Sequence, residues 1–382
     1  MPPNGMDRRT VLKTSGTALA AATAGCIGGN GGGSDFRPMD VEEFPVSDLE
    51  STFNLWNWYD GFANYAQEQF PATADGVDEV NVSGYSAPSE WFTQLQSGNH
   101  SIDNIGATGT YVGRSMENDL LEPLPVENMP SWENIPQSYK DDVNEYFSDD
   151  DGNIYCVPEA TVLAPALGYN TNYFDEPPSS WEILWDEDLE GQVTVWDRSY
   201  IAGSIAAKIA GQDWRDPDDF DELQELLLQQ KPLNNTYWQE YQAGMQMFIN
   251  EEVMAGMMTM GRLFTARFEH DAPIDYVIPE EGTMYSQDQF VIPKGAPHPR
   301  ASTQFLDWAA KTGNAVKLFT SMGYKPAVND LESQLQEEGV PQEHIDFITW
   351  SDDQQSRMDF QAPFPEDVRT GYDEMWTRVK AA

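Results

Sequence analysis

The stretch VDEVNVSGYSAPSEWFTQLQSGNH, residues 77–100, indicates how the chain folds. Val80 and Val82 alternate with polar residues, which is typical of a half-buried β-strand. The segment 87–100 then predicts a helix with a cap signal at Ser89. A strand followed directly by a helix is the repeating unit of an α/β fold.

The neighbouring segments repeat this pattern. Residues 52–62, TFNLWNWYDGF, have the aromatic alternation of a first strand, and residues 63–74 predict a helix that ends at Pro71. Residues 102–118, IDNIGATGTYVGRSMEN, predict a third strand, a turn and a further helix. A later strand is predicted at 192–196. Strands that alternate with helices predict an α/β class protein with a parallel sheet.

The composition of the 382 residues allows two domains with sizeable cores, because 40% are apolar and 12 are tryptophans. The net charge is −43, from 64 acidic and 21 basic residues, of which nine are lysines. A nucleic-acid binder needs a basic surface, so that class is excluded. The acids are spread along the whole chain. This favours a surface adapted to high salt over a protein that gathers cations.

The N-terminus has the features of an export signal. Arg8 and Arg9 form a twin-arginine pair, and a short run of small, apolar residues leads to Cys26. We interpret 1–25 as a twin-arginine lipoprotein signal peptide and 26–50 as a lipidated cysteine with a flexible tether. The run is too short to cross a bilayer, and no later stretch is long and apolar enough to do so. The sequence therefore predicts a protein held outside the cell membrane by a lipid.

Catalytic and metal signals are weak. The four histidines are scattered, and no zinc, nucleophile-elbow or phosphate-loop motif occurs. DDDG at 149–152 resembles part of a calcium loop, but we interpret it as a surface turn. MAGMMTM at 254–260 offers thioethers for copper, but a buried strand is the better interpretation. We expect Cys156 to be a small buried hydrophobe. The sequence predicts no enzyme, no metal and no cofactor.

Aromatic residues and single carboxylates lie at or near the ends of predicted strands. Examples are WYD at 58–60, SGY at 83–85, TY at 110–111, WDRSY at 196–200 and QD at 287–288. In parallel α/β sheets, ligands bind beyond the carboxyl ends of the strands. Aromatic faces beside carboxylates suit a cationic organic ligand, through cation–π attraction and charge-assisted hydrogen bonds.

From about residue 54 onward the sequence resembles the substrate-binding proteins of ABC importers, specifically the spermidine/putrescine-binding group. The blocks that carry the resemblance are LWNWYDGF (55–62), SSWEILWDEDLEGQVTVWD (179–197), GMMTMGRLF (256–264), PIDYVIPEEGTMYSQDQFVIPKGAPHP (273–299), FLDWAA (305–310) and MGYKPAVN (322–329). The resemblance implies a periplasmic-binding-protein-like fold. Such a fold has two lobes, each with a mixed sheet flanked by helices, and a ligand cleft between them.

The resemblance also implies boundaries and partners. Lobe I would hold 50–163 and 287–330, and lobe II would hold 164–286 and 331–382. The protein would be a monomer that captures a small organic solute, a polyamine such as spermidine or putrescine or a related amine. It would deliver this solute to membrane permease subunits.

The pocket of the family falls on ten positions of this chain: Trp58, Tyr59, Asp60, Ser83, Tyr85, Tyr111, Asp197, Asp288, Tyr324 and Gln361. Three aspartates, Asp60, Asp197 and Asp288, would pair with ammonium groups. The rings of Trp58, Tyr85 and Tyr324 would stack on the methylene chain of the ligand.

Some positions depart from the family pattern. Tyr200 stands where a second acid is expected, and Thr259 and Ser286 replace two tryptophans. Arg262 and Arg198 are also near the predicted pocket in sequence. A buried arginine would repel a polycation and could clamp a carboxylate or phosphonate. The alternative is that Arg262 is a surface arginine of the helix that follows the segment MAGMMTM (254–260). The second hypothesis is therefore the same receptor fold with a zwitterionic or anionic solute, such as an aminophosphonate.

Overall fold

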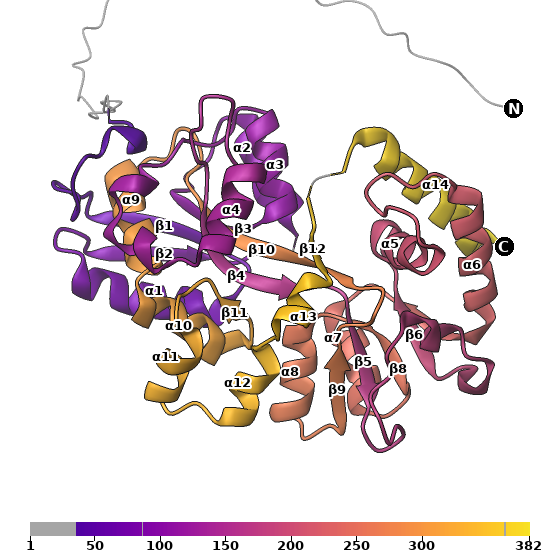
Figure 1. Ribbon diagram of the computed structural model, residues 1–382. Coiled ribbons are helices and arrows are strands. Elements are labelled where there is room, and N and C mark those ends of the chain that lie inside the picture. Colours follow the sequence, from indigo (N-terminus) through magenta and orange to yellow (C-terminus); the bar gives the residue numbers. More distant parts are fainter. Residues whose placement is uncertain (1–35, 86, 363) are drawn as a thin grey trace, which may run out of the picture. The chain divides into compact units, whose positions relative to one another are not determined.

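The computed structural model of the protein describes residues 36–85, 87–362 and 364–382. These residues contain two β-sheets with helices packed on them, drawn in Figure 1. The predicted α/β class, with two mixed sheets flanked by helices, is confirmed. The predicted signal segment, its two arginines and Cys26 lie outside the described residues.

The first sheet has seven strands among the described residues, in the order β11-β4-β10-β3-β1-β2, with β12 paired to β10. The strands are β1 (Thr52–Asn57), β2 (Glu79–Ser83), β3 (Asn104–Thr108), β4 (Val157–Leu163), β10 (Thr283–Val291), β11 (Lys325–Pro326) and β12 (Met358–Phe360). β1 is parallel to β2 and β3, whereas β10 runs antiparallel between β3 and β4. The parallel strands alternate with α1 (Asp60–Thr73), α2 (Pro88–Ser97) and α3 (Gly109–Glu117), as the sequence predicts.

The second sheet has five strands in the order β7-β6-β8-β5-β9 within the same described ranges. They are β5 (Ala166–Asn170), β6 (Val193–Trp196), β7 (Asn234–Trp238), β8 (Ala255–Met258) and β9 (Ile274–Val277). β6 is parallel to β7 and β8, and β5 is antiparallel to β8 and β9. All five strands lie between β4 and β10 in sequence, so the second sheet is inserted into the chain that builds the first.

The remaining helices pack on the two sheets. They are α4 (Gln137–Tyr146), α5 (Ser199–Ala210), α6 (Phe220–Gln230), α7 (Tyr241–Ile249), α8 (Met260–Phe268), α9 (Pro299–Ala309), α10 (Thr312–Met322), α11 (Leu331–Glu337), α12 (Gln342–Ile348), α13 (Asp352–Ser356) and α14 (Glu366–Ala381). α5, α6 and α14 pack together at the second sheet (Figure 1). No helix in the described ranges is long and apolar enough to cross a membrane.

Local sequence explains where several elements begin and end. The side chain of Asp219 accepts hydrogen bonds from the N–H groups of Asp221 and Glu222 and so caps α6. The two acids in this first turn also suit the positive end of the helix dipole. α5 ends at Gly211, which has a φ of 70° that a residue without a side chain adopts readily.

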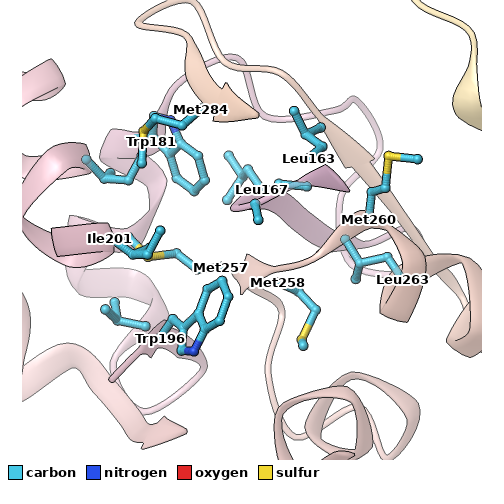
Figure 2. Close-up of a cluster of buried hydrophobic side chains, with 14 of the residues drawn as sticks. Leu163, Leu167, Trp181, Trp196, Ile201, Met257, Met258, Met260, Leu263 and Met284 are labelled. Carbon is cyan, nitrogen blue, oxygen red and sulfur yellow. The ribbon is translucent and has the colours of Figure 1, made fainter. Parts of the chain in front are cut away.

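Each sheet has its own buried hydrophobic cluster. Figure 2 shows the cluster at the second sheet, where Leu163 and Leu167 lie near Trp181. Met257 and Met258 of β8 belong to this cluster, and both are fully buried. The methionine-rich segment is therefore part of a core, which confirms its interpretation as a buried strand.

Two smaller interpretations are also confirmed. Cys156 is fully buried, and burial raises the pKa of its thiol well above the usual range. Residues 149–152 form a surface turn, in which Oδ1 of Asp149 accepts from the N–H groups of Asp151 and Asn153 at 3.0 and 2.8 Å.

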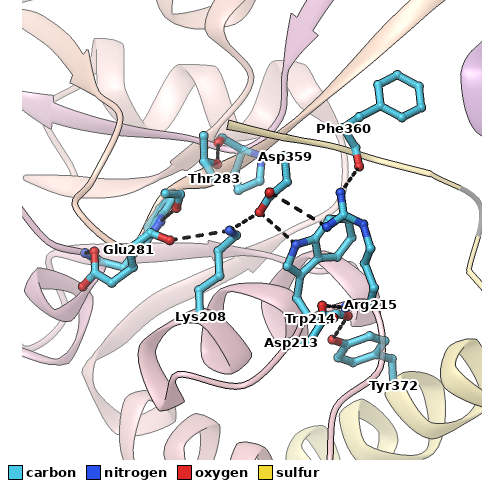
Figure 3. A network of polar contacts seen from close by, with 12 residues as sticks. Lys208, Asp213, Trp214, Arg215, Glu281, Thr283, Asp359, Phe360 and Tyr372 are labelled. Atoms are coloured by element: carbon cyan, nitrogen blue, oxygen red, sulfur yellow. Dashed lines mark hydrogen bonds and ion pairs between the residues drawn. The ribbon is translucent and has the colours of Figure 1, made fainter. Parts of the chain in front are cut away.

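The chain passes between the two sheets at three places: after β4, before β10 and after β12. Figure 3 shows a network that ties β12 to the second sheet's helices. Lys208 of α5 forms an ion pair with Asp359 of β12 at 2.6 Å, and Trp214 Nε1 donates to the same carboxylate at 3.0 Å. Arg215 also donates to the Phe360 carbonyl at 2.9 Å. These polar bonds hold the third crossing in place.

The assignment of residues to lobes stays a prediction. β12 pairs with β10 of the first sheet, although we predicted that residues 331–382 belong with the second lobe. Segment α11–α12 packs against both α10 and α8. The C-terminal part of the chain is thus shared between the two layers.

Two predicted helix boundaries are wrong. α2 begins at Pro88, with Ala87 rather than Ser89 at the cap position, and Glu90 accepts the Ala87 N–H at 2.9 Å. Proline suits the first helical position because its missing N–H would have had no helical partner. α1 continues past Pro71 to Thr73.

Candidate ligand-binding site

Asp288 is the most deeply buried of the predicted acids, with only 3% of its surface exposed. It lies on β10 and is paired in register with Thr108 of β3 and Ala160 of β4. Burial raises the pKa of Asp288 to about 7, and a hydrogen bond from the Trp58 side chain acts in the opposite direction. Burial therefore disfavours the charged form of the predicted ammonium reader.

A second acid lies beside it because of an irregularity between β10 and β4. Asp288 is paired with Ala160, whereas the next residue, Gln289, is paired with Pro158. Glu159 is the extra residue of β4 at this point. Such bulges re-aim side chains and are common next to functional sites.

Glu159 is 4% exposed, and its Oε2 atom is buried without a hydrogen-bond partner among the described residues. Burial and then the charge of Asp288 raise the pKa of Glu159 well above its usual range, while the Asn57 side chain opposes the shift. Neither acid belongs to an ion pair in the described part of the chain. The two carboxyl groups thus form a buried acid pair, Glu159–Asp288.

Aromatic side chains surround the acid pair. Tyr85 is buried and donates its hydroxyl to the Gly106 carbonyl; burial and then the charges of the two acids raise its pKa. The Trp58 ring lies 5.9 Å from the ring of Tyr324 and 5.5 Å from that of Tyr59. The acid pair also acts on Tyr324. Burial raises the pKa of the Tyr324 hydroxyl, and the charge of Asp288 adds to that shift.

Two arginines meet at Tyr241, the first residue of α7. The guanidinium of Arg262, on α8, lies 5.9 Å from the centre of the Tyr241 ring. The Tyr241 side chain is 37% exposed. Its partial burial raises the pKa of the hydroxyl, and the charges of Arg198 and Arg262 oppose that shift, as does a hydrogen bond from Arg198. Arg198 also stacks over the Trp196 ring at 5.2 Å. Arg262 is half-buried.

Tyr111 and Tyr200 lie on the same side of the cluster as Tyr241. Burial raises the pKa of Tyr200, and Arg198, Tyr241 and Tyr111 all act on it electrostatically. The Tyr111 ring packs edge-on against Trp91 at 5.7 Å. These two tyrosines come from α3 at the first sheet and α5 at the second, so residues of both layers contribute.

Asp60 and Ser83 lie at the periphery. Asp60 is exposed at the start of α1, and Ser83 ends β2 half-buried. Contacts of the described residues link Asp60 to Tyr59 and Gly84, and none links it to Asp288.

Asp197 is held by another part of the chain. Its carboxylate accepts hydrogen bonds from Gln239 at 2.6 Å, Trp376 at 2.7 Å and Lys380 at 2.9 Å. Burial alone would raise the pKa of Asp197, but these bonds outweigh it and hold the pKa below its usual range. A ligand ammonium group would have to compete with Lys380 for this carboxylate.

Gln361 follows β12 and is buried, with 5% of its surface exposed. Its backbone N–H donates to the Tyr285 carbonyl at 2.7 Å, and its Nε2 atom is buried without a partner among the described residues. It is therefore an unpaired donor at the third crossing between the sheets.

The described contacts join one group of predicted residues and leave the rest apart. Residues joined through contacts or charge interactions are Trp58, Tyr59, Tyr85, Tyr111, Tyr200, Arg262, Asp288 and Tyr324. Sequence reasoning missed Glu159 and Tyr241. The signal for Glu159 was its position as the one charged residue in the apolar run 154–170.

This arrangement suits a small organic solute. Aromatic faces, a buried acid pair and two arginines can bind apolar, cationic and anionic groups, respectively. Within the described ranges, no group of three or more histidine, cysteine, aspartate or glutamate side chains could hold a metal ion.

Comparison with known proteins identifies the family of the chain. A family model described as bacterial extracellular solute-binding protein matches residues 66–341. The chain is 27% identical over 288 residues to a putrescine/cadaverine-binding protein of Pseudomonas aeruginosa, covering 70% of this chain and 77% of that protein. It is 25% identical over 278 residues to a spermidine/putrescine-binding periplasmic protein of Haemophilus influenzae, covering 72% and 74%.

Solved structures confirm the fold. The spermidine/putrescine ABC transporter substrate-binding protein PotD of Streptococcus pneumoniae superposes with a TM-score of 0.76 at 19% identity, over 87% of this chain and 99% of that one. A lipoprotein of Treponema pallidum superposes with a TM-score of 0.69 at 17% identity, over 86% and 99%. The chain belongs to the bacterial extracellular solute-binding protein family, whose members are small-molecule receptors of ABC transporters.

Proposed function

We propose that this chain is the receptor of an ABC importer that captures a small organic amine, of the putrescine or spermidine class. The carrying observation is Asp288, a carboxyl group buried beside rings and without an ion-pair partner among the described residues. Buried charges are normally paired. A ligand ammonium group would supply the missing charge, and the names of the two curated relatives support this class.

In this proposal, the rings of Trp58, Tyr85 and Tyr324 contact the methylene chain while Asp288 accepts from one ammonium group. The two lobes close on the ligand. Lobe I holds 50–163 and 287–330, and lobe II holds 164–286 and 331–382. The ligand is later released without having undergone a chemical reaction.

The same proposal includes the location of the protein. The sequence around Arg8, Arg9 and Cys26 supports twin-arginine export and a lipid anchor at the outer side of the cell membrane. The glycine-rich tether would hold a monomeric receptor beside its permease.

Isothermal titration of the mature domain with putrescine and spermidine tests the amine. We expect binding, and we expect Asp288→Asn to weaken it about 100-fold, because it removes the charged partner of a desolvated ammonium group. The matched control is Asp346→Asn on the exposed side of α12, which should bind like the original chain. Equal affinities for the two variants would contradict the role of Asp288.

A zwitterionic or anionic solute is a second candidate, favoured by one observation: Arg262 and Arg198 both act on Tyr241 near the acid pair. An amine at Asp288 and an acidic group at these arginines would suit an aminophosphonate or amino acid. Titration with 2-aminoethylphosphonate separates the candidates. If the solute is zwitterionic, Arg262→Ala should abolish its binding. If it is a polyamine, that variant should bind as well or more tightly.

A further inference from the structure

The pair Glu159–Asp288 is built by the fold rather than by sequence proximity. The irregular pairing of β4 and β10 inserts Glu159 opposite the junction of Asp288 and Gln289. Both acids are at least 96% buried. Two carboxyl groups in such a setting cannot both ionise without a nearby cation, because each charge destabilises the other.

The described residues supply no cation to this pair. The groups that act on Asp288 or Glu159 are the neutral Trp58 and Asn57 side chains and the other acid of the pair. Glu159 Oε2 and Asn57 Nδ2 are both buried without hydrogen-bond partners of good geometry. An unpartnered, buried carboxyl oxygen is costly, and it is available to accept a hydrogen bond from a ligand group.

We propose that Glu159 is a further ligand-binding residue, and that Glu159 and Asp288 together hold a proton which an ammonium group of the solute displaces. This inference rests on the proposed function, because it needs an amine ligand at this site. It adds a residue outside the ten positions that the resemblance implies, and it couples solute capture to proton release.

Charges balance in this exchange. Before binding, one carboxyl of the pair is protonated and the other is ionised, so the pair carries one negative charge. An R–NH₃⁺ group enters, the shared proton leaves to solvent, and two carboxylates then accept hydrogen bonds from one ammonium group. The site again carries one net negative charge, and no covalent bond to the solute forms or breaks.

Other titratable groups around the pair do not titrate in the same range. Tyr85, Tyr241 and Tyr324 face it, and burial raises the pKa of each above the ordinary value for tyrosine. Arg198 and Arg262 are the positively charged groups that act on Tyr241. On the other face of β10, Asp142 accepts from Gln287 at 2.6 Å, and its pKa is raised to about 6. Asp142 could mimic the effect, so the variants below must separate its contribution from that of the pair.

Calorimetry of the mature domain with putrescine tests the proposal. Titrations at pH 7 in buffers of different ionisation enthalpy measure the protons released per solute bound. We expect a release that approaches one proton, and an affinity that rises up to about tenfold per pH unit between pH 6 and 8. If putrescine fails to bind, spermidine and 2-aminoethylphosphonate are used in the same way.

Three variants sharpen the test. Glu159→Gln keeps the shape and removes one carboxyl group of the pair, so proton release should fall below that of the original chain and affinity should drop about tenfold or more. Asp142→Asn should leave the proton release unchanged. Glu343→Gln, on the exposed start of α12, is the matched control and should behave like the original chain.

The outcomes distinguish the two proposals. Amine binding without proton release from the original chain at pH 6 to 8, with unchanged affinity for Glu159→Gln, overturns this inference and leaves the proposed function standing. Loss of proton release in Asp142→Asn rather than Glu159→Gln overturns it as well. Failure of every amine to bind overturns both. The measurement on the original chain decides the matter even if Glu159→Gln does not fold.

Discussion

Asp197 and Asp288 follow the same sequence pattern, an acid at or near the end of a predicted strand, yet the fold gives them opposite environments. Asp197 is clamped by Lys380, Trp376 and Gln239, and its pKa is lowered. Asp288 is buried beside a second acid, and its pKa is raised to about 7. The first aspartate stabilises the fold when it is charged. Asp288 destabilises the fold when it is charged, because a buried carboxylate has no cation beside it until a cationic ligand binds.

The largest expected effect comes from Asp288→Asn. The folded state binds a proton at Asp288 more tightly than the unfolded chain does, so the stability of the original chain falls as pH rises from about 4 to 7. The variant lacks this penalty and should be more stable at pH 8 by up to about 4 kcal/mol, with little difference at pH 4. Urea unfolding at both pH values measures this. If Asp288→Asn were less stable than the original chain at pH 8, the contrast between Asp288 and Asp197 would be contradicted.

Asp197→Asn should have the opposite sign and a smaller size. We expect a loss of about 2 kcal/mol at pH 7, because charge-assisted bonds to Lys380 and Trp376 are weakened. The folded pKa of Asp197 is lowered, so its contribution is present above the unfolded value and is lost as pH falls through the folded value. The variant and the original chain should therefore converge in acid. A difference that persists at pH 2.5 would point to packing instead.

Lys208→Met extends the comparison to the third crossing. It removes the buried cation that pairs with Asp359, but Trp214 and Arg215 remain near that carboxylate (Figure 3). Since Asp359 is 38% exposed, solvent screens part of the loss, and we expect about 1–2 kcal/mol. Thermal unfolding in high salt measures the loss.

The smallest effect should come from Asp60→Asn, the third predicted ammonium reader. Asp60 is exposed, so stability should change by less than about 0.5 kcal/mol, and putrescine affinity by no more than about fivefold. Calorimetric titration beside Asp288→Asn gives the ratio directly. An equal loss of putrescine affinity in Asp60→Asn and Asp288→Asn would mean that the exposed fraction of an acid does not predict its contribution to binding.

Much of the first sheet was predictable. The valine alternation around Val80 and the strand–helix order after Thr52 depend on local periodicity, which a sequence displays directly. The helix boundaries at Ser89 and Pro71 were wrong because proline can occupy positions inside or at the start of a helix when its missing N–H is tolerated.

The site was predictable only in part. Trp58, Tyr324 and Asp288 could be selected because they stand in recognisable blocks, and Tyr85 because it follows a predicted strand. Glu159 could not be given a partner, because it meets Asp288 through a one-residue shift between strands more than 100 residues apart in sequence.

By itself, the sequence determined the α/β class, the order of strands and helices in the first layer, and the residue types that a solute could contact. Those features follow from local periodicity and side-chain chemistry. Only the tertiary structure decided which acid is neutralised and which is not. That depends on whether a cation such as Lys380 reaches the carboxylate or burial leaves it without one, and long-range pairing sets both.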